Sequence, residues 1–370
     1  MFLNWAYRLF PPRRVDRILI NLMLPIGDTL FTTPTIRALR RRFPDAHIAA
    51  LVFPTNAGVL HANEDIDEVI LHPTGQTFTS LNYARFLLGM RRQRFTIAVE
   101  MRPYVWYLSV LCGAWRRLSF DIPAYQWFLP LGGRPWKQRH AVESYATTVR
   151  LLGLRIDQSR LIVRATDQDR AAIVDALARE GIGPNERLIV LHPGGEGFRG
   201  MKRWEPARFA ALADRLAERH GARALIIGGR DELALAYDVA GKMRTTGLVL
   251  NGRVSLGQSI ALLERSYVFV GDDSAPLHMA SSLGVPTVGI FGPTSVTNYR
   301  PLGPYVEVAR ADIVCSPCFF FVGSQPVWAT STCRVPTCLH ALSIDAVLAA
   351  AERAVARRAA GVRLRLGDEG

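Results

Sequence analysis

Short apolar runs recur along the chain, and most of them are followed by a segment in which apolar residues repeat at helical spacing. The runs predict strands at residues 17–22, 48–53, 69–71, 96–100, 161–163, 188–191, 224–227, 248–250, 267–270 and 287–291. The helical segments are 78–92, 140–152, 168–180, 206–219, 232–242 and 256–265. Strands that alternate with helices in this way are typical of an α/β protein with parallel sheets.

The alternation falls into two series. Thr166, with Asp169 three residues further on, is typical of a helix N-terminus and starts the second series. At 370 residues the chain is long enough for two domains that each bury a core. We therefore predict two doubly wound domains, residues 1–165 and 166–345, followed by a C-terminal helix and basic tail at 346–370.

The stretch from Tyr267 to Thr294 predicts a strand, a loop and a helix that lead into a second strand. The apolar run stops at Gly271, two acids and a serine follow, and the helix has Pro276 in its first turn and Gly284 at its end. Ligands bind at the carboxyl ends of such strands, and a helix N-terminus suits a phosphate group. The pattern therefore indicates a nucleotide pocket.

Two further turns are predicted at the same edge of the second sheet. His192-Pro193-Gly194-Gly195 precedes a loop with Lys202, one of only three lysines in the chain, which could neutralise a diphosphate or be a solvated loop charge. Gly228-Gly229 precedes Glu232, which could accept the hydroxyls of a ribose or simply stabilise a helix dipole.

The first strand leads through a glycine loop to Asp28, at the mouth of an arginine-rich helix. Asp28 could be a helix N-cap, and Pro34 predicts that the helix starts late or is kinked. Residues 1–155 hold 20 basic and 10 acidic residues, which favours an anionic partner over an evenly charged surface. An aromatic and basic stretch at 102–139 lacks a recognisable nucleic-acid module, so we do not expect nucleic acid.

Composition limits the remaining classes. A hydrophobic fraction of 49% and a charged fraction of 21% exclude global disorder. No apolar run is long enough to span a bilayer, and the N-terminus lacks an apolar signal region, so we expect a cytosolic protein. Cys315, Cys318, Cys333 and Cys338 crowd into a loop at 312–340, where they could hold a structural zinc or iron ion or remain free thiols.

The ordered set of these motifs resembles glycosyltransferase family 9, the bacterial heptosyltransferases. The resemblance rests on NLMLPIGDTLFTTPTIRALRRRFP, HPGGEGFRGMKRWEPARFAAL, IIGGRDE and VGDDSAPLHMASSLGVPTVGIFGPT, and it covers nearly the whole chain. It implies a GT-B architecture of two facing Rossmann-like domains with a central cleft. The first domain would bind the acceptor, and the second would bind an ADP-sugar, usually ADP-heptose.

The resemblance also implies residue roles. Asp28 would be the general base of an inverting transfer that needs no metal cofactor, and Lys202 would stabilise the departing diphosphate. The donor would contact Gly194, Gly195, Lys202, Gly229, Glu232, Asp273, Ser274, Ala275, Pro276, Leu277 and His278. The acceptor, a phosphorylated lipopolysaccharide core at the cytosolic face of the bacterial inner membrane, would contact Gly27, Asp28, Arg37, Arg40, Arg41 and Arg102.

One departure from the family pattern is Ala275, which stands where the family usually has glycine and would narrow the loop if that position needs a positive φ. Several alternatives therefore stay open. The acceptor could be a protein such as an autotransporter, the chain could be a nucleotide-sugar-binding scaffold without turnover, or it could be a sugar-nucleotide epimerase. The N-terminal aromatic residues with Trp106, Trp115 and Trp127 could rest on an anionic membrane.

Overall fold

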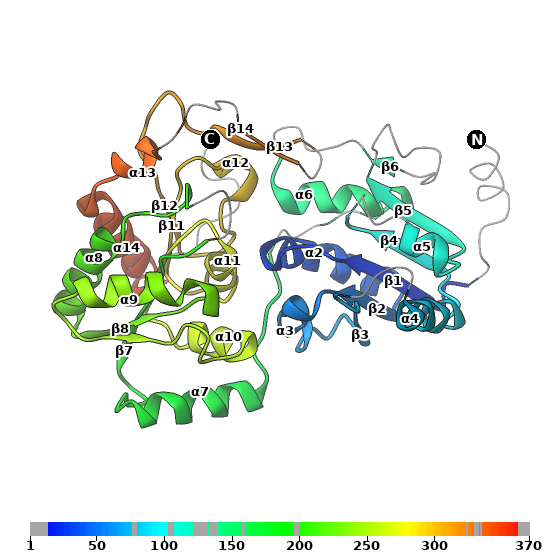
Figure 1. The fold of residues 1–370 in the computed structure, drawn as a ribbon, viewed down its shortest axis with the longest axis horizontal. Helices are drawn as coiled ribbons and strands as arrows, with labels where there is room; N and C mark the ends of the chain where they lie inside the picture. The colour runs from blue at the N-terminus through cyan, green and yellow to red at the C-terminus, as the bar shows by residue number, and fades with distance from the viewer. Residues whose placement is uncertain are drawn as a thin grey trace. The chain divides into compact units, whose positions relative to one another are not determined.

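The computed structural model describes residues 14–75, 80–102, 107–120, 132–133, 139–154, 156, 160–195, 200–322, 325–328, 333 and 335–361. The chain forms two compact units, residues 1–162 and 163–370, beside our expected boundary after residue 165. Each unit is built around its own six-stranded sheet, in which all strands are parallel (Figure 1). The prediction of two α/β domains with parallel sheets is therefore confirmed.

The sheet of the first unit has the strand order β3-β2-β1-β4-β5-β6. Its strands are β1 Arg17–Leu22, β2 His47–Val52, β3 Glu68–Leu71, β4 Ile97–Glu100, β5 Arg116–Phe120 and β6 Gly132–Gly133. The central strands β1, β2 and β4 are almost wholly buried, as expected for strands covered on both faces. The sequence did not predict β5, because arginines interrupt its apolar pattern.

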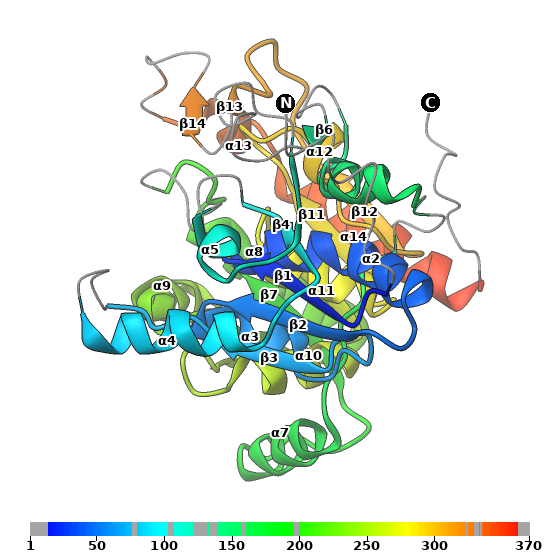
Figure 2. The same cartoon turned by 90° about the vertical axis from the view of Figure 1, so that its right-hand side faces the viewer.

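The helices of the first unit cover this sheet. They are α2 Ile26–Arg42, α3 Ala57–Leu60, α4 Leu81–Arg92, α5 Tyr107–Leu111 and α6 Ala141–Ala146, with the 3₁₀ turns η1 Pro54–Asn56 and η4 Thr147–Leu152. Helices α4 and α5 lie side by side in both views and share one apolar cluster with the strands (Figures 1 and 2). Helix α2 packs against α6 instead.

Helix α2 corrects the expectation of a late start. It runs without a break from Ile26 and includes both Asp28 and Pro34, so Asp28 lies in the first turn and is not the N-cap. Pro34 has no N–H for the Leu30 carbonyl, but the Thr33 hydroxyl donates to that oxygen at 2.7 Å. The side chain of Thr33 therefore replaces the missing backbone donor.

The predicted strand at 161–163 is wrong. Residues 160–166 have no regular secondary structure, and the Ile162 N–H donates to the Thr33 hydroxyl at 2.9 Å rather than to a neighbouring strand. The apolar side chains of Leu161 and Val163 are nevertheless buried, which explains the misleading pattern.

The sheet of the second unit has the strand order β12-β11-β10-β7-β8-β9. Its strands are β7 Arg187–His192, β8 Ala222–Ile226, β9 Gly247–Val249, β10 Val268–Asp272, β11 Thr287–Ile290 and β12 Val306–Ala309. A separate antiparallel hairpin, β13 Phe319–Val322 and β14 Gln325–Trp328, lies within the cysteine-rich segment and was not predicted.

The helices of the second unit are α7 Asp167–Arg179, α8 Pro206–His220, α9 Leu233–Lys242, α10 Leu256–Glu264, α11 Ala275–Ser282, α12 Val296–Tyr299, α13 Thr337–His340 and α14 Ile344–Ala359, with the 3₁₀ turn η5 Arg230–Glu232. Thr166 caps α7 in a capping box with Asp169, as its spacing predicted. Trp204 is fully buried in the core. None of the helices that the structure describes has the length and apolarity of a membrane span.

Candidate functional site

Both sheets reverse their strand order between two central strands. The reversal lies between β1 and β4 in the first unit and between β7 and β10 in the second. Ligands of open parallel sheets bind beyond the carboxyl ends of the strands at such a switch point. The motifs singled out in the sequence follow these central strands, so each unit places its candidate residues where a ligand would bind.

The end of β7 carries a buried histidine that connects two neighbouring turns. His192 Nε2 lies 3.2 Å from Glu232 Oε2, and its Nδ1 lies 2.9 Å from the Ser274 hydroxyl. Ser274 also donates to the Asp272 carbonyl oxygen at 3.0 Å. His192 therefore links the glycine turn before α9 to the turn before α11. The sequence motif that begins with this residue did not predict a role for it.

Glu232 is held in place rather than left as a free surface carboxylate. Its Oε2 accepts the Gly229 N–H at 3.0 Å, and a Cβ on Gly194 would lie only 2.0 Å from its Oε1. Burial alone would raise its pKa, but the hydrogen bonds and charge around it, chiefly from His192, lower the pKa to about 2. Glu232 is therefore ionised at neutral pH. Its carboxylate can lie this close to the backbone only because residue 194 is a glycine.

The end of β10 carries an ion pair. Lys202 Nζ donates to Asp273 Oδ2 at 3.2 Å and lies 5.4 Å from the centre of the Phe319 ring. The Asp273 side chain is 7% exposed and that of Lys202 is 14% exposed. Burial alone would raise the pKa of Asp273, but the Lys202 ammonium and the His278 imidazole hold it well below its ordinary value.

Asp272, next to Asp273, has a different environment. It is fully buried, and its two carboxyl oxygens lie 3.2 and 3.3 Å from the Trp204 N–H that donates to them. Burial raises the pKa of Asp272 well above its ordinary value, although the Trp204 N–H and Arg203 oppose this. This contact attaches the loop that contains Lys202 to the end of β10.

The turn after β10 leads directly into α11. Ser274 is the N-cap position, Ala275 is the first helical residue and Pro276 follows it in the first turn. Arg94 is the one non-glycine residue with a positive φ that the described part of the chain contains, so Ala275 is not strained. The idea that position 275 requires a positive φ is wrong. Leu277 and His278 are buried in α11.

In the first unit Asp28 and Gly27 lie in the first turn of α2, beyond the end of β1. The Tyr145 hydroxyl on α6 donates to Asp28 Oδ1 at 2.8 Å. Arg102, just after β4, donates to the Met23 carbonyl oxygen at 2.8 Å and so packs against the same loop. The structure therefore brings Gly27, Asp28 and Arg102 to one edge of the first sheet.

A buried pair of polar side chains on β1 and β4 holds the start of this loop. Asn21 and Glu100 are register partners on β1 and β4, and the Asn21 amide donates to Glu100 Oε2 at 2.8 Å. Asn21 Oδ1 in turn accepts the Met23 N–H at 3.2 Å. Burial raises the pKa of Glu100 to about 8, and hydrogen bonds from Ser109 and Asn21 offset it only in part. Glu100 is largely protonated below that pH.

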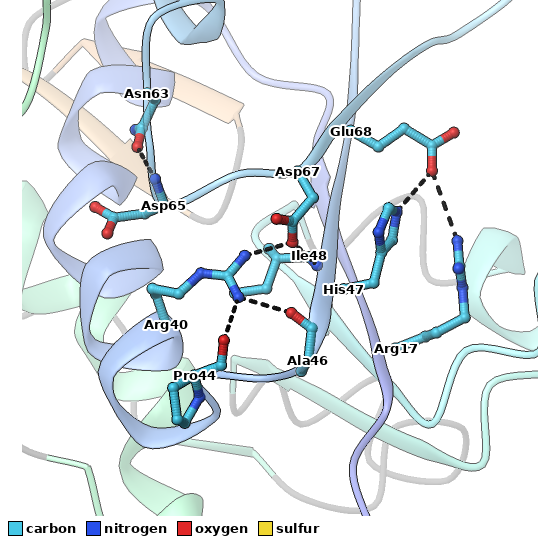
Figure 3. Close-up of polar contacts among 10 residues, drawn as sticks. All are labelled: Arg17, Arg40, Pro44, Ala46, His47, Ile48, Asn63, Asp65, Asp67 and Glu68. Atoms are coloured by element: carbon cyan, nitrogen blue, oxygen red, sulfur yellow. Dashed lines mark hydrogen bonds and ion pairs between the residues drawn. The ribbon is translucent and has the colours of Figure 1, made fainter.

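The arginines of α2 do not join Asp28. Arg40 follows Asp28 by 12 residues, which in a helix corresponds to about 18 Å. Arg40 contacts Asp67 and the carbonyl oxygens of Pro44 and Ala46 (Figure 3), and Arg37 Nε pairs with Asp65 Oδ2 at 3.1 Å. Arg37, Arg40 and Arg41 therefore lie towards the amino edge of the sheet, where α2 ends, and their contact with an acceptor stays a prediction.

The four clustered cysteines are free thiols in the structure, with Cys318 and Cys338 buried and Cys315 exposed. Burial raises the pKa of the Cys338 thiol to about 11, and the thiols of Cys318, Cys315 and Cys333 add to the effect. Within the described segments, no group of three or more histidine, cysteine or acidic side chains is arranged to hold a metal ion. A structural zinc or iron ion at these cysteines stays a prediction.

Several site residues were missed by sequence reasoning. His192, Asp272 and Tyr145 make the contacts described above. His192 and Asp272 had a signal, because each is a polar residue that ends an apolar strand at a switch point, whereas Tyr145 had none. Trp106, Trp127 and the N-terminal aromatic residues lie outside the described residues.

Two doubly wound parallel sheets with charged turns at their switch points define a broad class of nucleotide-binding α/β architecture. A family model described as glycosyltransferase family 9 (heptosyltransferase) matches residues 125–326, more than half of the chain. The chain therefore belongs to glycosyltransferase family 9, and it is a glycosyltransferase.

Individual relatives agree with this assignment. The chain is 26% identical over 297 residues to lipopolysaccharide heptosyltransferase 3 of Escherichia coli, which covers 74% of this chain and 83% of that protein. The crystal structure of a family 9 glycosyltransferase from Veillonella parvula superposes with a TM-score of 0.79 at 23% identity, over 93% of this chain and 98% of that one. The E. coli ADP-heptose lps heptosyltransferase II superposes with a TM-score of 0.74 at 18% identity, over 93% and 99% of the two chains. These structures share the fold.

Proposed function

We propose that this protein transfers a heptose, with inversion, from ADP-heptose to a hydroxyl group of a lipopolysaccharide core. The observation that carries the proposal is the partly buried Lys202–Asp273 pair at the switch point of the second sheet, in a chain that belongs to the heptosyltransferase family. The relative named as lipopolysaccharide heptosyltransferase 3 supports the choice of donor and acceptor.

The donor binds at the carboxyl edge of the second sheet. Lys202 is a cation that a diphosphate can share with Asp273, and the first turn of α11 adds the positive end of a helix dipole. Glu232, ionised and held by His192, accepts the ribose hydroxyls of the nucleotide. Gly194, Gly195 and Gly229 leave room for the nucleotide to approach the backbone.

Asp28 is the general base. It lies in the first turn of α2 at the carboxyl edge of the first sheet, and Tyr145 orients its carboxylate. An inverting transfer needs no covalent intermediate: the acceptor oxygen attacks the anomeric carbon as Asp28 takes its proton and ADP departs. The charge that develops on ADP is stabilised by Lys202 and α11, so no step calls for a divalent cation.

The acceptor is anionic and the protein acts at the cytosolic face of the inner membrane. The excess of 20 basic over 10 acidic residues in 1–155 supports an anionic acceptor and a peripheral contact with an anionic membrane. We include a structural zinc or iron ion at the cysteine quartet in the proposal, because the thiols of Cys315, Cys318 and Cys333 all act on the pKa of Cys338. Metal analysis of the purified, reduced protein tests for this ion. Protein that contains neither zinc nor iron would contradict the proposed metal site.

The test is ADP release by the wild-type protein. We expect ADP release from ADP-heptose only when a lipopolysaccharide core acceptor is present, and we expect ADP to raise the melting temperature more than GDP or UDP does. Release with an autotransporter acceptor but not with the core would move the function to protein modification. An absence of release with every acceptor, together with thermal stabilisation by ADP, would leave a nucleotide-sugar-binding scaffold.

A further inference from the structure

Exposed apolar side chains are concentrated on one part of the first unit. Among the residues that the structure describes, ten large hydrophobic side chains are exposed, and six of them fall between residues 71 and 115. These six are Leu71, Leu81, Leu88, Val110, Leu111 and Trp115. Single exposed hydrophobic residues need no explanation, but a cluster of this kind marks an interaction surface.

Helix α4 shows how this surface is built. Tyr83 and Met90 are buried against the sheet, whereas Leu81 is 67% exposed and Leu88 is 55% exposed. At about 100° per residue, Leu81 and Leu88 lie roughly opposite the two buried residues, and Arg85 and Arg92 fall on the same outer stripe. The outermost line of α4 thus alternates leucine and arginine.

Helix α5 and the turn after it continue the surface. Val110 and Leu111 are exposed on α5, and Trp115, just after it, is 56% exposed. The two helices contact one another, and a Cβ on Gly113 would lie 3.7 Å from the Arg91 side chain of α4. We define the α4–α5 face as Leu81, Arg85, Leu88, Arg91, Arg92, Val110, Leu111 and Trp115; the helices that carry it are neighbours in Figures 1 and 2.

The charged side chains of this face are all arginines, and the nearby Glu68, which accepts from Gln93 at the end of α4, is paired with Arg17 and His47. From Val69 to Phe120 the sequence contains seven arginines, at positions 85, 91, 92, 94, 102, 116 and 117, and a single acidic residue, Glu100. Glu100 is fully buried between the strands and the helices, so it contributes nothing to the surface. No ion pair joins Arg85, Arg91 or Arg92 to another residue within the described ranges, and the face is therefore cationic.

We propose that the α4–α5 face docks on an anionic phospholipid membrane. A helix stripe of leucine and arginine with a neighbouring tryptophan suits the lipid interface, because the apolar side chains enter the acyl boundary while the arginines pair with phosphate groups. Tryptophan, with an apolar ring and a polar N–H, is suited to the headgroup level. The inference rests on the proposed function only in so far as a membrane carries the acceptor.

The experiment is vesicle co-sedimentation of the full chain. Vesicles of phosphatidylethanolamine with phosphatidylglycerol are compared with pure phosphatidylcholine, at low and high salt. We expect binding to the anionic vesicles only, weakened by salt. Arg85→Gln with Arg92→Gln is expected to lower the partition coefficient about 25-fold, about fivefold for each arginine. Leu88→Ala with Trp115→Ala is expected to lower it by about tenfold.

Matched controls come from residues outside the α4–α5 face, namely Arg160 near the end of the first unit and three positions in the second unit. Arg160→Gln with Arg179→Gln removes two other exposed arginines, and Val174→Ala with Tyr237→Ala removes two other exposed apolar groups. These variants are expected to bind vesicles like the wild type. Circular dichroism and thermal unfolding check that every variant is folded. Equal losses in the controls and in the α4–α5 variants would overturn the proposal, as would undiminished binding by the latter.

The same variants also test two other partners for the face, a second copy of the chain and an acidic protein. A dimer in analytical ultracentrifugation that the α4–α5 substitutions dissociate would show an interface between copies of the chain and overturn membrane docking. Binding to an acidic protein without binding to vesicles would do the same. Turnover with a delipidated, water-soluble core separates this inference from the proposed function, because we expect the α4–α5 variants to retain it in full.

Discussion

The two sheets have the same strand order, yet the charges at their switch points differ. Each switch point buries a carboxyl group whose pKa is raised by burial: Glu100, to about 8, in the first unit, and Asp272, well above its ordinary value, in the second. The second unit also gathers two ionised carboxylates, Glu232 and Asp273, and pairs them with His192 and Lys202. The partly buried Lys202–Asp273 pair therefore sets the second switch point apart.

The difference shows what topology decides and what it leaves to the side chains. A reversed strand order marks where a ligand can bind in either unit. The residues that follow the strands decide which ligand that is: a loop that presents Asp28 in one case, and the Lys202–Asp273 pair in the other. This comparison predicts that substitutions in the two units affect different steps.

A large effect is expected from Lys202→Met. Loss of the ammonium is expected to lower kcat/KM about 100-fold and to weaken ADP binding, because one donor to a developing anion is worth about that much. Lys242→Met is the matched control, since Lys242 pairs with Asp238 on the exposed side of α9. Steady-state kinetics measures kcat/KM, and calorimetry measures the affinity for ADP. Unchanged ADP affinity in the Lys202 variant would remove the lysine from the donor site.

A smaller effect is expected from Gly194→Ala. The added methyl group would lie 2.0 Å from Glu232 Oε1, so the carboxylate must move away from His192. We expect a loss of about 1–3 kcal/mol in the free energy of unfolding, together with weaker ADP binding. Gly195→Ala is the control for stability, because its methyl group would have its nearest neighbours at 3.8 and 3.9 Å. Equal losses of unfolding free energy in both variants would contradict the packing argument.

Another effect is on the pH dependence of stability, and it belongs to the first unit. Folded Glu100 keeps its proton up to about pH 8, whereas the unfolded chain releases it near its ordinary value of 4.5. The contribution of Glu100 to stability is therefore complete below pH 4.5 and declines as the pH rises to 8. The slope is at most about 1.4 kcal/mol per pH unit.

Glu100→Gln is expected to flatten this decline, since glutamine keeps an acceptor for the Asn21 amide without a titrating proton. Urea unfolding at pH values between about 5 and 8 measures it. Glu143→Gln, at an exposed position of α6, serves as the control. An unchanged slope in the Glu100 variant would mean that this carboxyl is ionised in the folded protein.

The sequence predicted most of the fold, because buried parallel strands are continuous apolar runs. It failed where that signal was broken: arginines hide β5, and the buried residues Leu161 and Val163 imitate a strand without a partner. The helical position of Asp28 was also missed, because Pro34 suggested a break that the Thr33 hydroxyl prevents.

The candidate site was predictable where a motif follows a strand, and not where it depends on contacts between distant segments. Lys202 and Asp273 were placed at one edge from their order along the chain, and the structure brings them together. The Tyr145 contact with Asp28 spans 117 positions, and no local pattern reveals it. The charge of Arg37 and Arg40 was visible, but their partners Asp65 and Asp67 were not.

The central claim is that Asp28 removes the acceptor proton while the second unit alone holds ADP. Single-turnover ADP release by Asp28→Asn, with ADP affinity measured on the same preparation, tests it most directly. We predict that release from ADP-heptose in the presence of the core acceptor slows about 1,000-fold, while ADP binds as tightly as to the wild type. Release at the wild-type rate, or a loss of ADP affinity that matches the loss of rate, would contradict the account.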